Sequence, residues 1–168
     1  MKRRELSIVA LDAVDRRLVQ ALSASGREAA SGLARALGLS RQSVAERLRE
    51  LERRGVIRGY RADVDPAVLG LTVRAQIRLT LDGAAPAGKE REVLRRLAAS
   101  AFVRAVYRVS GEDCFLVFVV CRSIADVNAL LANLQATRAI QSSRTSFVLE
   151  TVLEKGPLGP LEAALVAD

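Results

Sequence analysis

The hydrophobic pattern of this 168-residue chain first changes its period between residues 55 and 72. Before this change, apolar residues recur three or four positions apart, which is the spacing of one face of a helix. After it, apolar and polar residues alternate through residues 73–81, which is the spacing of a half-buried strand. A chain of this length holds one medium core or two small ones. We therefore expect a helical domain followed by a second domain that contains a sheet.

Three short helices are expected in the first domain. The first begins at an Asp12 N-cap and ends near residue 26, and the second covers residues 29–37. Gly38 follows the second helix, where a helix C-cap requires a positive φ angle. The third helix begins at a Ser40 N-cap and ends near residues 54–55. A short extended ribbon is expected at residues 56–62.

The spacing Ala34-x3-Gly38-x5-Val44 indicates a helix-turn-helix motif. A small residue lets two helices approach, a glycine forms the turn, and an apolar residue holds the second helix in place. An ordinary antiparallel helix pair is the structural alternative. Through Pro66 the chain carries fourteen Lys and Arg against nine Asp and Glu, and beyond it twelve against ten. This local positive excess favours a polyanionic partner, although a solvated arginine face is the other interpretation.

The second helix of the motif turns its polar side away from the apolar stripe of Val44, Leu48 and Leu51. Its N-terminal turn carries donors and small groups that suit base edges, and the arginines further along suit phosphates. Arginine performs both tasks, so the sequence leaves open which of them read bases. The candidate DNA-binding residues are Ser40, Arg41, Gln42, Ser43, Glu46, Arg47, Arg49, Arg53 and Arg58.

The second domain has the pattern strand, helix, two strands, helix, strand, which is the order of the ferredoxin-like α+β fold. Both helices then cover one face of a four-stranded sheet, and dimerisation is the simplest way to cover the other face. The elements are expected at residues 72–81, 89–100, 103–109, 114–121, 126–136 and 143–153. The expected boundaries are 1–63 for the DNA-binding domain, 64–71 for a linker, 72–155 for the ferredoxin-like domain and 156–168 for a tail.

Several classes of function are disfavoured by composition. The chain has no histidine, the commonest general base and metal ligand, and its two cysteines have no metal-binding spacing. We therefore expect no enzyme, no metal site and no cofactor. The sheet lacks the aromatic platform of RNA-binding modules, since Tyr107, Phe115 and Phe118 stand outside such a motif. With no long apolar run and no signal peptide, we expect a cytoplasmic protein that does not enter membranes.

Five blocks of sequence point to one known family. They are Leu11-Asp12-x2-Asp15, Leu33-Ala34-x2-Leu37-Gly38-Leu39-Ser40, Arg47-Leu48-x2-Leu51-Glu52-x2-Gly55-Val56-Ile57-x-Gly59-Tyr60, Val109-Ser110-Gly111-Glu112 and Arg144-Thr145-Ser146-Phe147-Val148-Leu149. Through them, nearly the whole chain resembles the leucine-responsive regulator/AsnC (Lrp/AsnC) family, also called feast/famine regulators. The resemblance implies a winged helix-turn-helix domain linked to a ferredoxin-like (RAM-type) regulatory domain. It also implies homodimers formed through the sheets, further assembly into octamers, and control of genes of amino-acid metabolism.

The resemblance further implies that an amino acid binds between dimers near the turn at residues 110–114. An amino-acid site needs donors for the carboxylate and acceptors for the ammonium group. Turn amides with Arg144 or Thr145 meet the first need, and Glu112 or Asp113 the second. The candidate effector-binding residues are Ser110, Gly111, Glu112, Asp113, Cys114, Arg144 and Thr145. A plain hairpin turn is the alternative.

Two departures from the family pattern affect this site. Where the family has Gly-x-x-Asp-Tyr, this chain has Gly111-Glu112-Asp113-Cys114-Phe115, and strand alternation turns Asp113 and Cys114 to opposite faces. Where the family has Leu-Pro-Gly-Val, residues 137–140 read Thr-Arg-Ala-Ile. The leading hypothesis is a sequence-specific DNA-binding transcriptional regulator modulated by an amino acid or a related small metabolite. The alternative is a ligand-independent architectural DNA-binding protein of the same fold.

Overall fold

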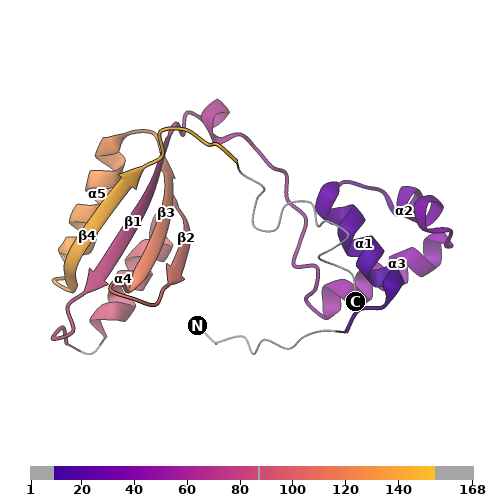
Figure 1. Ribbon diagram of the computed structural model, residues 1–168, viewed down its shortest axis with the longest axis horizontal. Coiled ribbons are helices and arrows are strands. Elements are labelled where there is room, and N and C mark those ends of the chain that lie inside the picture. Colours follow the sequence, from indigo (N-terminus) through magenta and orange to yellow (C-terminus); the bar gives the residue numbers. More distant parts are fainter. Residues whose placement is uncertain (1–9, 87, 154–168) are drawn as a thin grey trace. The chain divides into compact units, whose positions relative to one another are not determined.

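The computed structural model describes residues 10–86 and 88–153, which form two compact units (Figure 1). One unit extends to Asp63 and the other covers Val64–Val152. The expected tail at residues 156–168 lies outside the described residues. No helix in the described ranges combines the length and the apolar character needed to cross a membrane.

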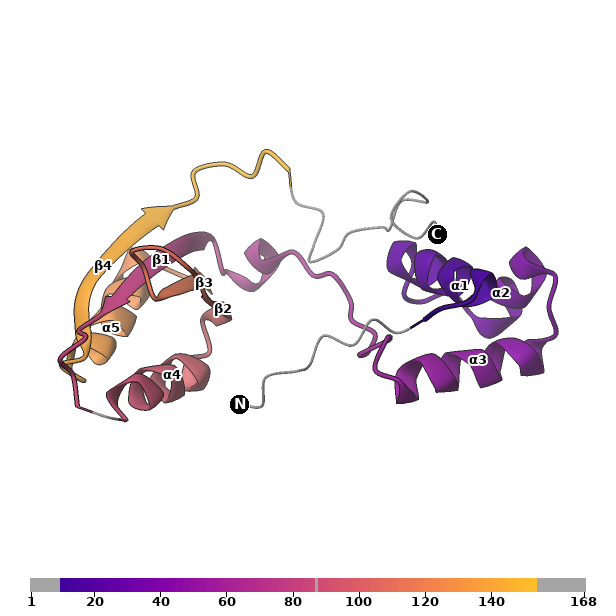
Figure 2. The same cartoon turned by 60° about the horizontal axis from the view of Figure 1, so that its bottom comes forward.

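The first unit contains α1 (Ala13–Ala24), α2 (Ala30–Leu37) and α3 (Arg41–Arg53). The predicted caps are confirmed: the Asp12 carboxylate accepts from the amide of Asp15, and the Ser40 hydroxyl accepts from the amide of Ser43. Gly38 has a φ angle of 69° and lets the chain turn from α2 into α3 within three residues. The core residues of this unit are Leu18, Leu33, Ala34, Val44 and Leu51. In Figure 2, α3 runs along one side of this unit, beneath α1 and α2.

The ribbon expected at residues 56–62 is not a β-structure, and the β wing implied for the first domain is not formed in the described chain. Gly55, with a φ angle of 72°, ends α3, and the chain then folds back. The amides of Val56 and Ile57 donate to the Leu51 carbonyl, and both side chains pack on the core. A β ribbon needs two paired strands, and among the described residues this segment has no strand partner.

The second unit contains the expected ferredoxin-like fold, in which four antiparallel strands are ordered β2-β3-β1-β4. Figures 1 and 2 show α4 and α5 on the same face of this sheet. The short 3₁₀ helix η1 (Pro66–Leu69) precedes β1. The elements are β1 (Val73–Leu81), α4 (Lys89–Ala99), β2 (Val103–Arg108), β3 (Phe115–Cys121), α5 (Ile124–Gln135) and β4 (Ile140–Phe147).

Strand alternation separates the two faces of the sheet. Ala75, Ile77 and Leu79 of β1 point to the helices and join the core of this unit. The alternate β1 residues lie on the opposite face, which we call the outer face. By strand register, Gln76 pairs with Phe118, and Arg78 pairs with Leu116 on one side and Arg144 on the other.

Two predicted boundaries were wrong. Helix α5 begins at Ile124 because Ser123 caps it and exchanges hydrogen bonds with Asp126 in a capping box. Strand β4 covers Ile140–Phe147 and not residues 143–153, because a tight turn at Arg138 places Ile140 directly opposite Leu81.

Candidate nucleic-acid interface and effector turn

The polar side of α3 is exposed because Val44 and Leu51 hold the opposite side in the core. Arg41 and Gln42 lie in the first turn of the helix and are exposed. Gln42 donates to the Glu46 carboxylate across 3.0 Å, so these two candidates form one polar pair. A helix N-terminus with exposed amide and guanidinium groups is suited to contact base edges and phosphates.

Four candidate arginines remain on the surface of this unit. Arg53 makes two hydrogen bonds to Glu50, one turn earlier on α3, and Arg49 donates to the Ala45 carbonyl across 3.2 Å. Within the described chain, Arg41 and Arg58 form no ion pair, and both are exposed. Their charges are therefore available to a phosphate backbone.

Arg47 is placed differently from the other candidates. Its Nη1 lies 2.6 Å from Oδ2 of Asp12, the N-cap of α1, and 2.7 Å from Oδ1 of Asp15 in the first turn of that helix. Hydrogen bonds to Asp12 and then to Asp15 raise the pKa of Arg47. The Asp15 amide, followed by the Arg47 guanidinium, lowers the pKa of Asp12. The sequence-based prediction of phosphate contact for Arg47 did not include these two partners, because a residue 35 positions away in the chain is invisible to a local pattern.

The turn after β2 places Asp113 and Cys114 on opposite sides, as predicted. Asp113 faces the outer side: its Oδ1 accepts from the Thr80 hydroxyl at 3.4 Å, and its Oδ2 lies 3.9 Å from Nε of Arg78. The Cys114 thiol accepts from the amide of Leu81 and packs against the core. Ser110, Gly111 and Glu112 are exposed before them. Cys114 is therefore a packing residue in this chain.

Arg144 and Thr145 lie on opposite faces of β4. Arg144 is exposed on the outer face opposite Arg78, so strand register brings Arg144 and Asp113 to either side of the same arginine. Thr145 pairs with Ile77 and faces the helix side. The sequence analysis missed Arg78 and Thr80, because their neighbours follow from the order of strands in the sheet and not from a local motif.

The outer face also carries an apolar patch on β2 and β3. The Tyr107 and Phe118 rings meet edge to face, with centroids 5.7 Å apart, and are 55% and 38% exposed. Half-buried Leu116 lies opposite Tyr107 in the strand register. An exposed aromatic pair on an uncovered sheet face is suited to protein contact.

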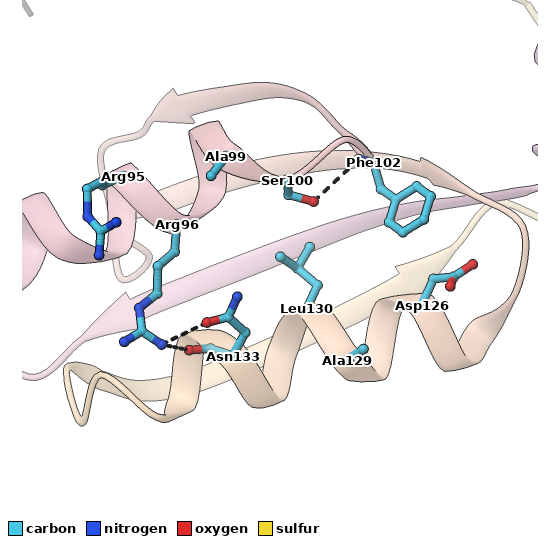
Figure 3. A pocket seen from close by; sticks show the side chains of 9 residues that line it. All are labelled: Arg95, Arg96, Ala99, Ser100, Phe102, Asp126, Ala129, Leu130 and Asn133. Carbon is cyan, nitrogen blue, oxygen red and sulfur yellow. Dashed lines mark hydrogen bonds between the residues drawn. The ribbon is translucent and has the colours of Figure 1, made fainter.

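A cavity of about 560 Å³ lies between α4 and α5 on the helix side of the sheet. Arg96 reaches from α4 to the backbone and side-chain oxygens of Asn133 on α5, as Figure 3 shows. None of the predicted effector-binding residues lines this cavity. Arg96 bridges this cavity from α4 to α5.

Comparisons with known protein families match both parts of the chain. A family model described as the AsnC-type helix-turn-helix domain matches residues 11–52, and one described as the Lrp/AsnC ligand binding domain matches residues 74–158. Curated relatives include the HTH-type transcriptional regulator AldR of Mycolicibacterium smegmatis, 34% identical over 88% of this chain and 86% of that protein. The HTH-type transcriptional regulator LrpA of Mycobacterium tuberculosis is 35% identical over 84% of this chain and 92% of its own length.

Solved structures are similar across most of the chain. Escherichia coli AsnC has a TM-score of 0.77 and 29% identity, covering 88% of this chain and 98% of its own. A transcriptional regulator from Neisseria meningitidis, solved as a complex with L-methionine, has a TM-score of 0.80 and 24% identity, covering 89% and 97%. The Neisseria meningitidis regulator, at this lower identity, shows that it shares the fold of this chain.

Proposed function

Because the chain belongs to the Lrp/AsnC family of transcriptional regulators, we propose that it binds specific DNA through α3 as a homodimer and responds to an amino acid. It is a DNA-binding regulator and not an enzyme, as its family domains and curated relatives are. The observation that carries the proposal is the helix-turn-helix in which a buried apolar stripe presents the polar side of α3 to solvent.

DNA recognition is assigned to the N-terminal half of α3. In the major groove, Gln42 suits adenine and Arg41 suits guanine, because each side chain pairs with two atoms of that base edge. Ser40, Ser43 and Glu46 lie beside them on the same helix. Arg49, Arg53 and Arg58 are assigned to phosphates, which set the register of the protein on the duplex.

Titration of DNA binding against salt tests this assignment. We expect affinity for the DNA upstream of the protein's own coding sequence to fall with salt, with a log–log slope of about −0.9 per phosphate contact. Arg41→Ala should weaken binding, whereas Arg95→Ala, which removes an exposed arginine of α4, should not. Binding that is independent of salt, or equal loss in both variants, would contradict the proposal.

We assign the effector site to the turn at residues 110–114, on the outer face of the sheet where Asp113 lies. This site would lie at an interface between the C-terminal domains of two chains. Arg144 supplies a cation for a carboxylate, and Asp113 or Glu112 supplies an anion for an ammonium group, with Ser110 and Gly111 amides nearby. The match to a ligand binding domain supports this site, as does the Neisseria meningitidis regulator of the same fold that was solved with L-methionine.

A thermal-shift screen of the twenty amino acids tests the effector. A ligand present at 100 times its Kd adds about 2.7 kcal/mol of stability, which raises the melting temperature by several degrees. The shift should disappear in Arg144→Ala and persist in Arg95→Ala. If no amino acid shifts the melting temperature or changes DNA affinity, the ligand-independent architectural protein is the better account.

A further inference from the structure

We propose that Arg47 is a positioning residue that holds the recognition helix α3 against the first turn of α1 and does not itself contact DNA. The inference rests on the proposed binding of DNA through α3 and assigns a different task to one of its arginines. In this role Arg47 affects DNA recognition indirectly, because it fixes the orientation of α3 and of the side chains at its N-terminal turn.

The geometry is a clamp between two helices. Arg47 lies in the middle of α3, and one of its guanidinium nitrogens lies within 2.7 Å of carboxylate oxygens from both Asp12 and Asp15. Arg54, at the end of α3, adds a second attachment, because it donates to the Ala10 carbonyl and lies 3.9 Å from Asp15. The start of α1 is therefore tied to α3 two turns apart, at Arg47 and Arg54.

The two carboxylates have different reasons to need this cation. Asp15 is only 8% exposed, and a buried charge is costly unless it is paired. Asp12 uses one oxygen to cap α1 and the other to accept from Arg47. The same carboxylate thus sets where α1 begins and where α3 lies against it.

The charges of the clamp cancel. Arg47 and Arg54 stand against Asp12 and Asp15, so the cluster carries no net charge toward a phosphate. Arg41 and Arg58 have no such partners in the described part of the chain. The salt dependence of DNA binding should therefore come from arginines such as these two and not from Arg47.

Asp12→Asn separates positioning from phosphate contact. Asparagine caps a helix as well as aspartate does, so the start of α1 is retained while one of the two carboxylate charges that hold Arg47 is removed. If Arg47 positions α3, Asp12→Asn should weaken specific DNA binding by about fivefold or more with an unchanged salt slope. If Arg47 contacts phosphate, removing its competing anion should tighten binding and steepen the slope.

Arg47→Ala provides a second readout. We expect lower affinity at every salt concentration but the same slope as the unmodified protein, whereas Arg41→Ala should lose about one unit of slope. Circular dichroism on each full-length variant establishes that the helices remain. A slope reduced in Arg47→Ala as much as in Arg41→Ala, or tighter binding by Asp12→Asn, would overturn this inference alone. Absence of salt-dependent binding by the unmodified protein would instead overturn the proposed function.

Discussion

At the scale of single residues, the Asp12 side chain contributes both to secondary structure, as a helix cap, and to tertiary structure, as a contact between two helices. One carboxylate oxygen accepts from the Asp15 amide and begins α1, and the other accepts from Arg47 of α3. Both interactions favour the ionised carboxylate, and the pKa of Asp12 is lowered, first by the amide and then by the guanidinium. Folding of this unit is therefore linked to ionisation of a surface carboxylate.

The lowered pKa predicts a pH dependence of stability. A carboxyl group whose pKa is lower in the folded state contributes its full stabilisation above the unfolded pKa, about 4, and loses it as the pH falls through the folded value. The decline in melting temperature below about pH 4 should be less steep in Asp12→Asn than in the unmodified protein. Asp63→Asn is the matched control, since this exposed carboxylate makes no ion pair in the described chain. Equal pH profiles in all three proteins would refute the linkage.

Arg138 gives a second prediction at this scale. It is the one non-glycine residue with a positive φ angle, 57°, among the described residues. This conformation costs an ordinary residue about 1 kcal/mol more than glycine. Arg138→Gly should therefore raise the free energy of unfolding by up to about 1 kcal/mol, measured by urea denaturation. Arg122→Gly, in a loop without a positive φ angle, should not stabilise the protein.

At the scale of elements, local signals predicted most of the fold. Capping residues and helical spacing placed α1, α2 and α3 within about two residues, and alternation placed β1, because each of these signals lies within a few positions of the element. The start of β4 was missed because Ser142 and Ser143 hide its alternation. It is defined by pairing with β1, about sixty to seventy positions earlier in the sequence.

The candidate sites also contain one part that local sequence predicts and another that it does not. The exposed first turn of α3 followed from the apolar stripe on its other side. The pairing of Arg47 with Asp12 and the gathering of Asp113 and Arg144 beside Arg78 did not follow, because they depend on how distant elements pack.

The hydrogen bonds between α4 and α5 predict how much stability the loss of Arg96 costs. Arg96 donates to both oxygens of Asn133 on α5 and also to Glu92 of its own helix, 2.7 Å away. Its loss therefore removes two charge-assisted hydrogen bonds between α4 and α5 and one within α4. Because Arg96 is partly exposed to solvent, we expect Arg96→Ala to cost only about 1 kcal/mol in urea denaturation. Arg95→Ala, its exposed neighbour, should cost much less. A smaller loss in Arg96→Ala than in Arg95→Ala would argue against the bridge.

At the scale of the whole molecule, the sheet packs one face against its own helices, and the described residues leave the outer face uncovered. The edge-to-face pair of Tyr107 and Phe118 gives the outer face an aromatic centre, and Arg74, Arg78 and Arg144 give it a basic side. We propose that a second copy of the chain covers this face. Two recognition helices joined in this way would address paired half-sites, one helical turn of DNA or a multiple of it apart.

A charge at the centre of this face should prevent dimerisation. Phe118→Glu places a carboxylate where two apolar surfaces meet, so light scattering during size-exclusion chromatography should give the mass of a monomer. Ile124→Glu is the matched control, because this apolar residue is also exposed but begins α5 on the helix layer. A dimer in both variants would place the interface elsewhere.

The central claim, that α3 reads DNA sequence, is tested most directly by a ratio of affinities. The ratio compares the Kd for unrelated DNA with the Kd for the DNA upstream of the protein's own coding sequence, at one salt concentration. We predict a ratio of about 10³ or more for the unmodified protein, falling by about tenfold or more in Gln42→Ala with little change in binding to unrelated DNA. The same ratio in both proteins would contradict base recognition by the first turn of α3.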